Sequence, residues 1–193
     1  MEASIIITTY NRPDLLKRAL ESAQNQTFKD YEIIVVDDFS DVPVKVPEGV
    51  NLLRHEENKG LSVARNNGIY EAKGKYIVCL DDDNELQPTF LEKTLKSVGD
   101  YDAVSVGRVI QYKDFADYVV PQLSKLSSID WGWLIKKKVF DVIQYDENLR
   151  ANEDTDFGIQ FTSKGYRFIT INKPLQVAFD DGGDSHSYPT PKH

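Results

Sequence analysis

Short uncharged runs rich in β-branched residues alternate along the chain with segments whose apolar residues recur at helical spacing. The runs at 4–9, 31–36 and 76–80 predict strands that are buried on both faces. Shorter runs predict further strands at 50–53, 103–110 and 168–171. The intervening segments predict helices after Asn11, from about 62 to 72, after Pro88 and from 154 to 163. Asn11 can cap the first of these helices, and Gly74 is the expected C-terminal cap of the second.

This alternation of strands and helices predicts an α/β fold with right-handed crossovers and a mostly parallel sheet that has helices on both faces. The pattern loosens beyond residue 112. Residues 115–126 fit either a helix or an irregular segment, residues 131–135 return toward strand character, and residues 138–143 suggest a short helix. We expect one domain over residues 1–193, because the chain contains no linker long enough to divide it.

Composition narrows the function classes. The net charge of −8 argues against a nucleic-acid-binding surface, and the only basic cluster is at 136–138. No apolar stretch approaches the roughly 20 residues that span a bilayer, and no signal peptide precedes the first strand, so we expect a cytoplasmic domain. The single cysteine, Cys79, lies inside a buried run and is expected to pack in the core.

Three consecutive carboxylates, Asp81, Asp82 and Asp83, follow the central apolar run directly. Three adjacent like charges at a strand end repel one another unless a cation compensates them. Ligands that are all oxygen suit Mg²⁺ or Mn²⁺ better than zinc. The stretch therefore predicts a divalent metal with a phosphate on its open side.

Other polar groups also follow predicted strands, and ligands of open α/β sheets bind beyond the carboxyl ends of the strands. The first strand is followed by Thr8 to Arg12, and the second by Asp37 and Asp38. If the first and fourth strands are neighbours, these groups and the acidic triplet share one crevice.

Five motifs occur in order along the chain. They read Ile-Ile-Ile-Thr-Thr-Tyr-Asn-Arg (5–12), Glu-Ile-Ile-Val-Val-Asp-Asp-Phe-Ser-Asp (32–41), Asn-Lys-Gly-Leu-Ser-Val-Ala-Arg-Asn-Asn-Gly (58–68), Leu-Asp-Asp-Asp (80–83) and Asn-Glu-Asp-Thr-Asp-Phe (152–157). In register, these five motifs resemble the inverting family 2 glycosyltransferases of GT-A fold. The resemblance implies a GT-A (Rossmann-like) nucleotide-sugar-binding fold, with a nucleotide part at about 1–112 and an acceptor-side part at about 113–180. It also implies a nucleotide-sugar donor, most often a UDP-sugar, and transfer with inversion at the anomeric carbon.

The resemblance implies a role for each donor-side residue. Thr8, Thr9 and Tyr10 would contact the nucleoside, with Tyr10 packing on the base, and Arg12 belongs to the same nucleotide set. Asp37 would accept a hydrogen bond from the base, whereas Asp38 could equally cap a turn with Ser40. Arg65 would pair with Asp37 or with a phosphate. Asp81 or Asp82 would hold the ribose or a metal-bound water, and Asp83 matches the main metal ligand.

The acceptor side supplies the base. Inverting transfer requires a carboxylate that takes the proton of the attacking hydroxyl. The resemblance assigns this role to Asp154, with Glu153 supporting the acceptor; without the upstream motifs, simple capping of the helix by an acidic residue would explain the pair. Trp131 and Trp133 could form the floor of an acceptor subsite, although core packing of at least one explains them equally well. His186 lies where some relatives have a further metal ligand.

Two other functions remain compatible with these residues. One is a catalytically silent nucleotide-binding or interaction domain, and the other is a nucleotidyltransferase, although the Gly-rich basic loop that such enzymes carry after the first strand is missing here. The acceptor could be a saccharide or a lipid-linked sugar at the inner face of a membrane. The abrupt end of the chain suggests a missing C-terminal part, through which alone we expect membrane contact.

Overall fold

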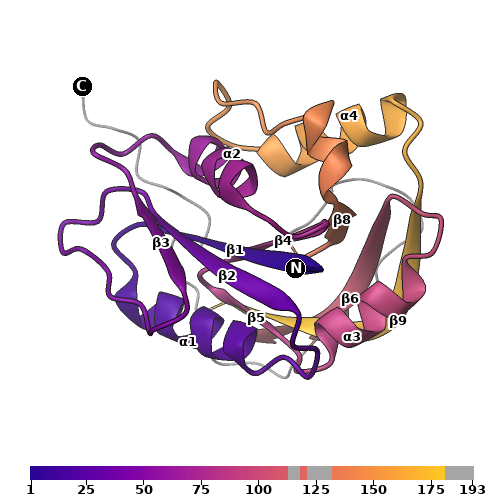
Figure 1. The fold of residues 1–193 in the computed structure, drawn as a ribbon, viewed down its shortest axis with the longest axis horizontal. Coiled ribbons are helices and arrows are strands. Elements are labelled where there is room, and N and C mark those ends of the chain that lie inside the picture. The colour runs from indigo at the N-terminus through magenta and orange to yellow at the C-terminus, as the bar shows by residue number, and fades with distance from the viewer. Residues whose placement is uncertain (113–117, 121–131, 181–193) are drawn as a thin grey trace.

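The computed structural model describes residues 1–112, 118–120 and 132–180 (Figure 1). Its strands are β1 (Ala3–Thr9), β2 (Tyr31–Asp37), β3 (Asn51–Arg54), β4 (Tyr76–Asp81), β5 (Asn84–Leu86), β6 (Ala103–Tyr112), β7 (Tyr118–Val120), β8 (Leu134–Lys136) and β9 (Phe168–Asp180). Its helices are α1 (Pro13–Gln24), α2 (Leu61–Glu71), α3 (Phe90–Ser97), α4 (Glu153–Ser163) and the 3₁₀ helix η1 (Lys137–Asp141). None of these described helices is long and apolar enough to cross a bilayer.

One curled sheet runs through the molecule in the order β3-β2-β1-β4-β8-β6-β9-β5, with β7 beside β6. The block β3-β2-β1-β4 is entirely parallel, as expected, and β1 and β4 are neighbours. Past β4 the sheet is mixed, because β8 lies antiparallel between β4 and β6, and β9 pairs with β6 in parallel.

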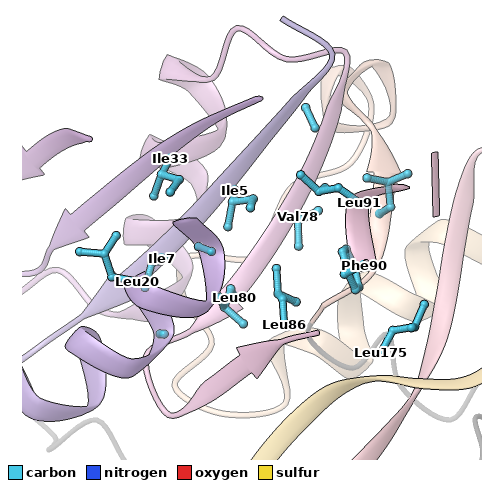
Figure 2. Packing of buried hydrophobic residues seen from close by; sticks show 14 of the residues in the cluster. Ile5, Ile7, Leu20, Ile33, Val78, Leu80, Leu86, Phe90, Leu91 and Leu175 are labelled. Carbon is cyan, nitrogen blue, oxygen red and sulfur yellow. The ribbon is translucent and has the colours of Figure 1, made fainter. Parts of the chain in front are cut away.

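Helices cover both faces of the sheet, and each face has its own hydrophobic core (Figure 1). Alternation along β1 produces this division, since Ile5 and Ile7 point to the core beneath α1 and α3 whereas Ile6 points to the core beneath α2 and α4. Figure 2 shows the first core, where Ile5 and Ile7 lie near Leu20 of α1. Burial on both faces explains why the central strands are continuous apolar runs.

Close backbone approach fixes where α2 lies and where it ends. A Cβ on Gly68 would lie 2.5 Å from Ile6 Cγ2, so only glycine lets the helix rest on β1 at this point. The helix stops at Glu71 with Ala72 as its C-cap, so the expectation that Gly74 caps it is wrong. Gly74 instead passes the backbone of β1, where a Cβ would lie 2.4 Å from the carbonyl carbon of Ala3.

The boundaries predicted after β4 need correction. The polar segment Asn84–Leu86 forms β5, which the pattern did not predict, and it pairs with the far end of β9. β9 continues to Asp180 rather than ending near residue 171. The pairing of β9 with β6 shifts in register on both sides of Gly107, and this irregularity accommodates Pro174 of β9.

Candidate active site

The carboxyl ends of β1, β2 and β4 lie side by side at one edge of the sheet. Thr8 is in register with Asp81, and Thr9 with Asp37. The buried Thr9 hydroxyl donates to Asp82 Oδ2 at 2.7 Å. The polar groups that follow β1, β2 and β4 therefore lie close together, as the sequence predicted.

Arg12 pairs with Asp82 and Asp83 of the acidic triplet. Its Nη1 lies 3.3 Å from Asp82 Oδ1 and 3.4 Å from Asp83 Oδ2, and a quarter of its side chain (25%) is exposed. Burial raises the pKa of Asp82 to about 6, although the Thr9 hydrogen bond and Arg12 oppose the shift. Burial, followed by the charges of Asp81 and Asp82, raises the pKa of Asp83 to about 7. The one guanidinium of Arg12 faces two carboxylates, which leaves Asp82 and Asp83 short of positive charge.

The acidic triplet fits Mg²⁺ or Mn²⁺ only if other groups complete the coordination. Within the described ranges, no three His, Cys, Asp or Glu side chains are grouped so that they could hold a metal ion. Magnesium sites in nucleotide enzymes commonly use one or two carboxylates, with substrate phosphates and water completing the shell. Asp82 and Asp83 can supply that protein share, and a further cation would offset the burial and the repulsion that raise their pKa values.

Arg65 joins the two acidic motifs of the chain. Its side chain is 1% exposed and lies beneath the sheet edge on α2. Nη2 donates to Asp81 Oδ1 at 2.8 Å, while Nη1 donates to Glu153 Oε1 at 3.0 Å and to Asp154 Oδ1 at 2.9 Å. Burial lowers the pKa of Arg65, but the charges of Asp154 and Asp81 outweigh burial and raise it well above its usual value.

The pairing of Arg65 with Asp37 is therefore a wrong expectation. Arg54, at the end of β3, forms an ion pair with the fully buried Asp37 carboxylate and also donates to the Ser40 carbonyl at 2.8 Å. The Ser40 amide donates to Asp37 Oδ1 at 2.9 Å, so Asp37, not Asp38, stabilises this turn. Whether Asp37 also reads the base stays a prediction.

Asp38 anchors a buried network that the sequence reading did not find. Its carboxylate accepts the amides of Lys59 at 2.9 Å and Gly60 at 2.8 Å, directly before α2. It also lies 2.6 Å from His55 Nδ1, and His55 Nε2 lies 2.9 Å from Asn67 Nδ2. Asp38, which is buried in the structure, and the Asn pair of the 58–68 motif were the residues from which the sequence could have indicated this network. Nothing in the sequence indicated His55.

Three described non-glycine residues have positive φ, and all lie in loops that border this edge of the sheet. They are Asn11 (φ 55°), Phe39 (φ 71°) and Asn152 (φ 62°). Asn11 does not cap α1 as expected; its amide donates to Ser40 Oγ at 2.9 Å and its Oδ1 accepts the Asp41 amide at 2.8 Å. Such backbone conformations persist only where surrounding contacts hold them, and they cluster at functional sites.

Of the two tryptophans predicted for an acceptor subsite, the structure describes only Trp133. Trp133 is buried (3% exposed) in the core under α4, with its ring centroid 6.4 Å from that of Phe161 and 4.8 Å from that of Phe168. The core alternative therefore applies to Trp133, and an acceptor-floor role does not. Trp131 and His186 lie outside the described residues. Tyr10 is partly exposed beside the buried Thr8 and Thr9, as a base-packing ring requires.

The fold is of the GT-A type, and the chain belongs to glycosyl transferase family 2. The model of that family matches residues 4–170. The chain is therefore a glycosyltransferase domain, and the α/β architecture expected from the motifs is confirmed.

Individual relatives agree with this placement. The uncharacterized glycosyltransferase YwdF of Bacillus subtilis is 32% identical, with 97% of this chain and 78% of that protein covered. The GalNAc(5)-diNAcBac-PP-undecaprenol beta-1,3-glucosyltransferase of Campylobacter jejuni is 29% identical, with 79% of this chain and 57% of that protein covered.

Solved structures show the same fold. The crystal structure of S. aureus TarS 1-349 in complex with UDP superposes with a TM-score of 0.78 at 18% identity, covering 93% of this chain and 61% of that one. The complex of the same protein with UDP-GlcNAc gives a TM-score of 0.78 at 19% identity, covering 99% of this chain and 62% of that one. The chain thus spans about three fifths of these structures.

Proposed function

We propose that this domain transfers a sugar from a UDP-sugar to an acceptor hydroxyl, with inversion of the anomeric centre and with Mg²⁺ or Mn²⁺ as cofactor. One observation carries the proposal: Arg65 holds Asp81 of the donor-side triplet and Asp154 of the acceptor-side pair on one guanidinium. The carboxylate proposed as the base is thereby fixed next to the donor-side triplet.

Asp154 is the base of the proposed reaction. The acceptor oxygen attacks the anomeric carbon from the face opposite the diphosphate, and the proton of that hydroxyl passes to the Asp154 carboxylate. The bond between the anomeric carbon and the phosphate oxygen breaks, and its electron pair leaves with UDP. Asp154 lies in the first turn of α4, where the amino-terminal end of a helix favours a carboxylate. Glu153 precedes it and orients the acceptor.

The donor lies on the strand ends. Tyr10 packs on the base, Thr8, Thr9 and Asp37 line the nucleoside, and Arg12 faces the diphosphate beside Asp82. Asp83, with Asp82, would hold the divalent ion, which when bound neutralises the departing diphosphate. His186 stays a further predicted ligand outside the described residues.

The relatives support the choice of substrates. The neighbours with the same fold were solved with UDP and UDP-GlcNAc, and the Campylobacter relative is named for transfer to an undecaprenol-linked glycan. We accordingly propose a UDP-sugar donor and a saccharide or lipid-linked acceptor, which would bring the domain to the inner face of a membrane.

Release of UDP from a panel of UDP-sugars, with and without Mn²⁺, tests the proposal directly, because water can replace an unknown acceptor. We expect slow Mn²⁺-dependent hydrolysis that Asp83→Ala abolishes, together with UDP binding by calorimetry. A folded protein that binds UDP but never cleaves a UDP-sugar, even when offered lipid-linked and free saccharide acceptors, would indicate a silent nucleotide-binding domain.

A further inference from the structure

Arg65 is the largest fully buried residue among those that the structure describes. A buried cation is costly unless its partners satisfy it. Here the partners come from two elements distant in sequence, since Asp81 ends β4 while Glu153 and Asp154 open α4. Such an arrangement requires a purpose beyond packing, because an aliphatic side chain would fill the space at lower cost.

The surroundings of Arg65 lock its guanidinium in one place. The Tyr145 ring covers it, with the guanidinium carbon 5.1 Å from the ring centroid. Asn66, the next residue of α2, holds Tyr145 by two hydrogen bonds, donating to its carbonyl at 2.9 Å and accepting its amide at 3.1 Å. Tyr145 in turn stacks on Phe157 of α4, with ring centroids 4.8 Å apart. The contacts among Arg65, Asn66, Tyr145 and Phe157 therefore link α2, the loop before α4, and α4 itself.

The hydrogen-bond pattern divides the guanidinium between two tasks. A single nitrogen, Nη1, serves both Glu153 and Asp154, whereas Nη2 serves Asp81. The planar fork thus sets the position of the base pair relative to the donor carboxylate. A lysine ammonium carries the same charge but lacks this geometry.

We propose that Arg65 is a positioning residue for the base: it fixes Asp154 and Glu153 against Asp81 and places a positive charge beside them, and it contributes little to nucleotide affinity. This assignment rests on the proposed function, and it replaces the nucleotide or phosphate contact expected for Arg65 from sequence. The donor is held instead by groups on the strand ends and by Arg12.

Arg65→Met and Arg65→Lys separate charge from geometry. Both variants are expected to lose about 10²-fold or more in kcat for UDP-sugar hydrolysis, while their Kd for UDP with Mn²⁺ stays within about fivefold of wild type. Only Arg65→Met should move the acidic limb of the kcat/KM profile upward, by about one pH unit or more, because only it removes the positive charge. Arg167 is exposed and directly precedes β9, so Arg167→Met is the matched control and should behave as wild type.

Three results would overturn the assignment. A folded Arg65→Met protein with unchanged kcat would do so, as would a loss of UDP affinity equal to the loss of kcat, which would make Arg65 a donor ligand. A loss of kcat with the acidic limb unmoved in both variants would leave only a structural role. If Arg65→Met does not fold, Arg65→Lys carries the kcat and Kd arms, and Glu153→Gln with Asp154→Asn in the Arg65→Met background removes two of the three unpaired carboxylates for the UDP titration.

Failure of the underlying function has a different signature. A wild-type protein that binds UDP but cleaves no UDP-sugar at any pH overturns the proposed transfer, and the role of Arg65 falls with it. An active wild type with an indifferent Arg65→Met variant overturns the role of Arg65 alone.

Discussion

Two arginines hold the acidic groups of this domain, and they do so in opposite ways. Arg12 is a quarter exposed and reaches Asp82 and Asp83 at 3.3 and 3.4 Å. Arg65 is 1% exposed and makes three ion pairs of 2.8 to 3.0 Å. The first arrangement leaves carboxylates with raised pKa values, and the second leaves a cation whose own pKa is raised.

This difference separates a site whose carboxylates hold their arginine loosely from a site whose carboxylates hold theirs at short distances, although one cation serves more than one carboxylate in both. The Arg12 cluster, defined as Arg12, Asp82 and Asp83, lies where a metal and a diphosphate are proposed to bind, so loose contacts can be exchanged for a ligand. The Arg65 cluster, defined as Arg65, Asp81, Glu153 and Asp154, must keep its geometry before the substrate arrives. Preorganised charge of this kind is where catalytic groups gain most.

The largest effect is expected within the Arg65 cluster. Asp154→Asn removes the proton acceptor and keeps the side-chain shape, so kcat for UDP release should fall by about 10²–10⁴-fold while the Kd for UDP changes little. Steady-state assays and calorimetry measure the two quantities. Asp156→Asn, two residues along the same helix, is the matched control, because Asp156 accepts from Gln160 at 2.6 Å and lies outside the cluster. Equal loss in both variants would remove Asp154 from its role.

Stability should divide the two arginines next. Arg65→Met leaves three partly buried carboxylates without their cation and is expected to lower the free energy of unfolding by about 3–5 kcal/mol. Arg12→Met should lower it by less than about 1 kcal/mol, because Arg12 is partly exposed and its partners can take up protons instead. Urea unfolding of both variants at pH 7 tests the contrast. Equal losses would show that the clusters do not differ.

Metal binding should reveal the unbalanced charge of the Arg12 cluster. The pKa of Asp83 is raised to about 7, so below that pH a proton competes with the ion for the carboxylate. The affinity for Mn²⁺ alone should therefore rise by about tenfold per pH unit between pH 6 and 7, more steeply below pH 6, where Asp82 is protonated as well, and level off above pH 8. Titrations followed by the signal of free Mn²⁺ measure this dependence. Affinity independent of pH between 5.5 and 7 would contradict it.

The smallest effect concerns the cost of keeping Asp83 ionised. Because its pKa is raised from 3.8 to about 7 in the folded protein, the folded state holds the proton more tightly, and stability is lost as the pH rises through this window. Asp83→Asn removes the titration and should increase the free energy of unfolding at pH 8 by about 1–3 kcal/mol, with little change at pH 4. The exposed Asp100→Asn should change neither value. A variant less stable than wild type at pH 8 would contradict the account.

The sequence predicted the part of the molecule in which hydrophobic pattern determines structure. The runs that became β1, β2 and β4 are buried on both faces, and their parallel pairing brought Thr9 and Asp82 together as expected. β5 was missed because three residues of mixed polarity carry no period, and their pairing with β9 is a long-range event. The extent of β9 was missed because Pro174 normally ends a strand unless a register shift accommodates it.

Within the site, residue types were easier to predict than partners. Both arginines and both acidic motifs were singled out, yet the sequence could not show that Arg54 rather than Arg65 reaches Asp37. Pairing among buried charges depends on which side chains the fold brings within 3 Å, and no local pattern encodes that. Trp133 illustrates the same limit, because an indole suits a sugar platform and a hydrophobic core equally well.

Calorimetric titration of UDP in the presence of Mn²⁺, on wild type, Arg12→Met and Arg65→Met, tests the division between the two clusters most directly. We expect wild type to bind UDP only weakly without Mn²⁺, Arg12→Met to lose about tenfold or more in affinity, and Arg65→Met to stay within about fivefold of wild type. Loss of UDP binding in Arg65→Met with full binding in Arg12→Met would reverse the two roles and contradict the account.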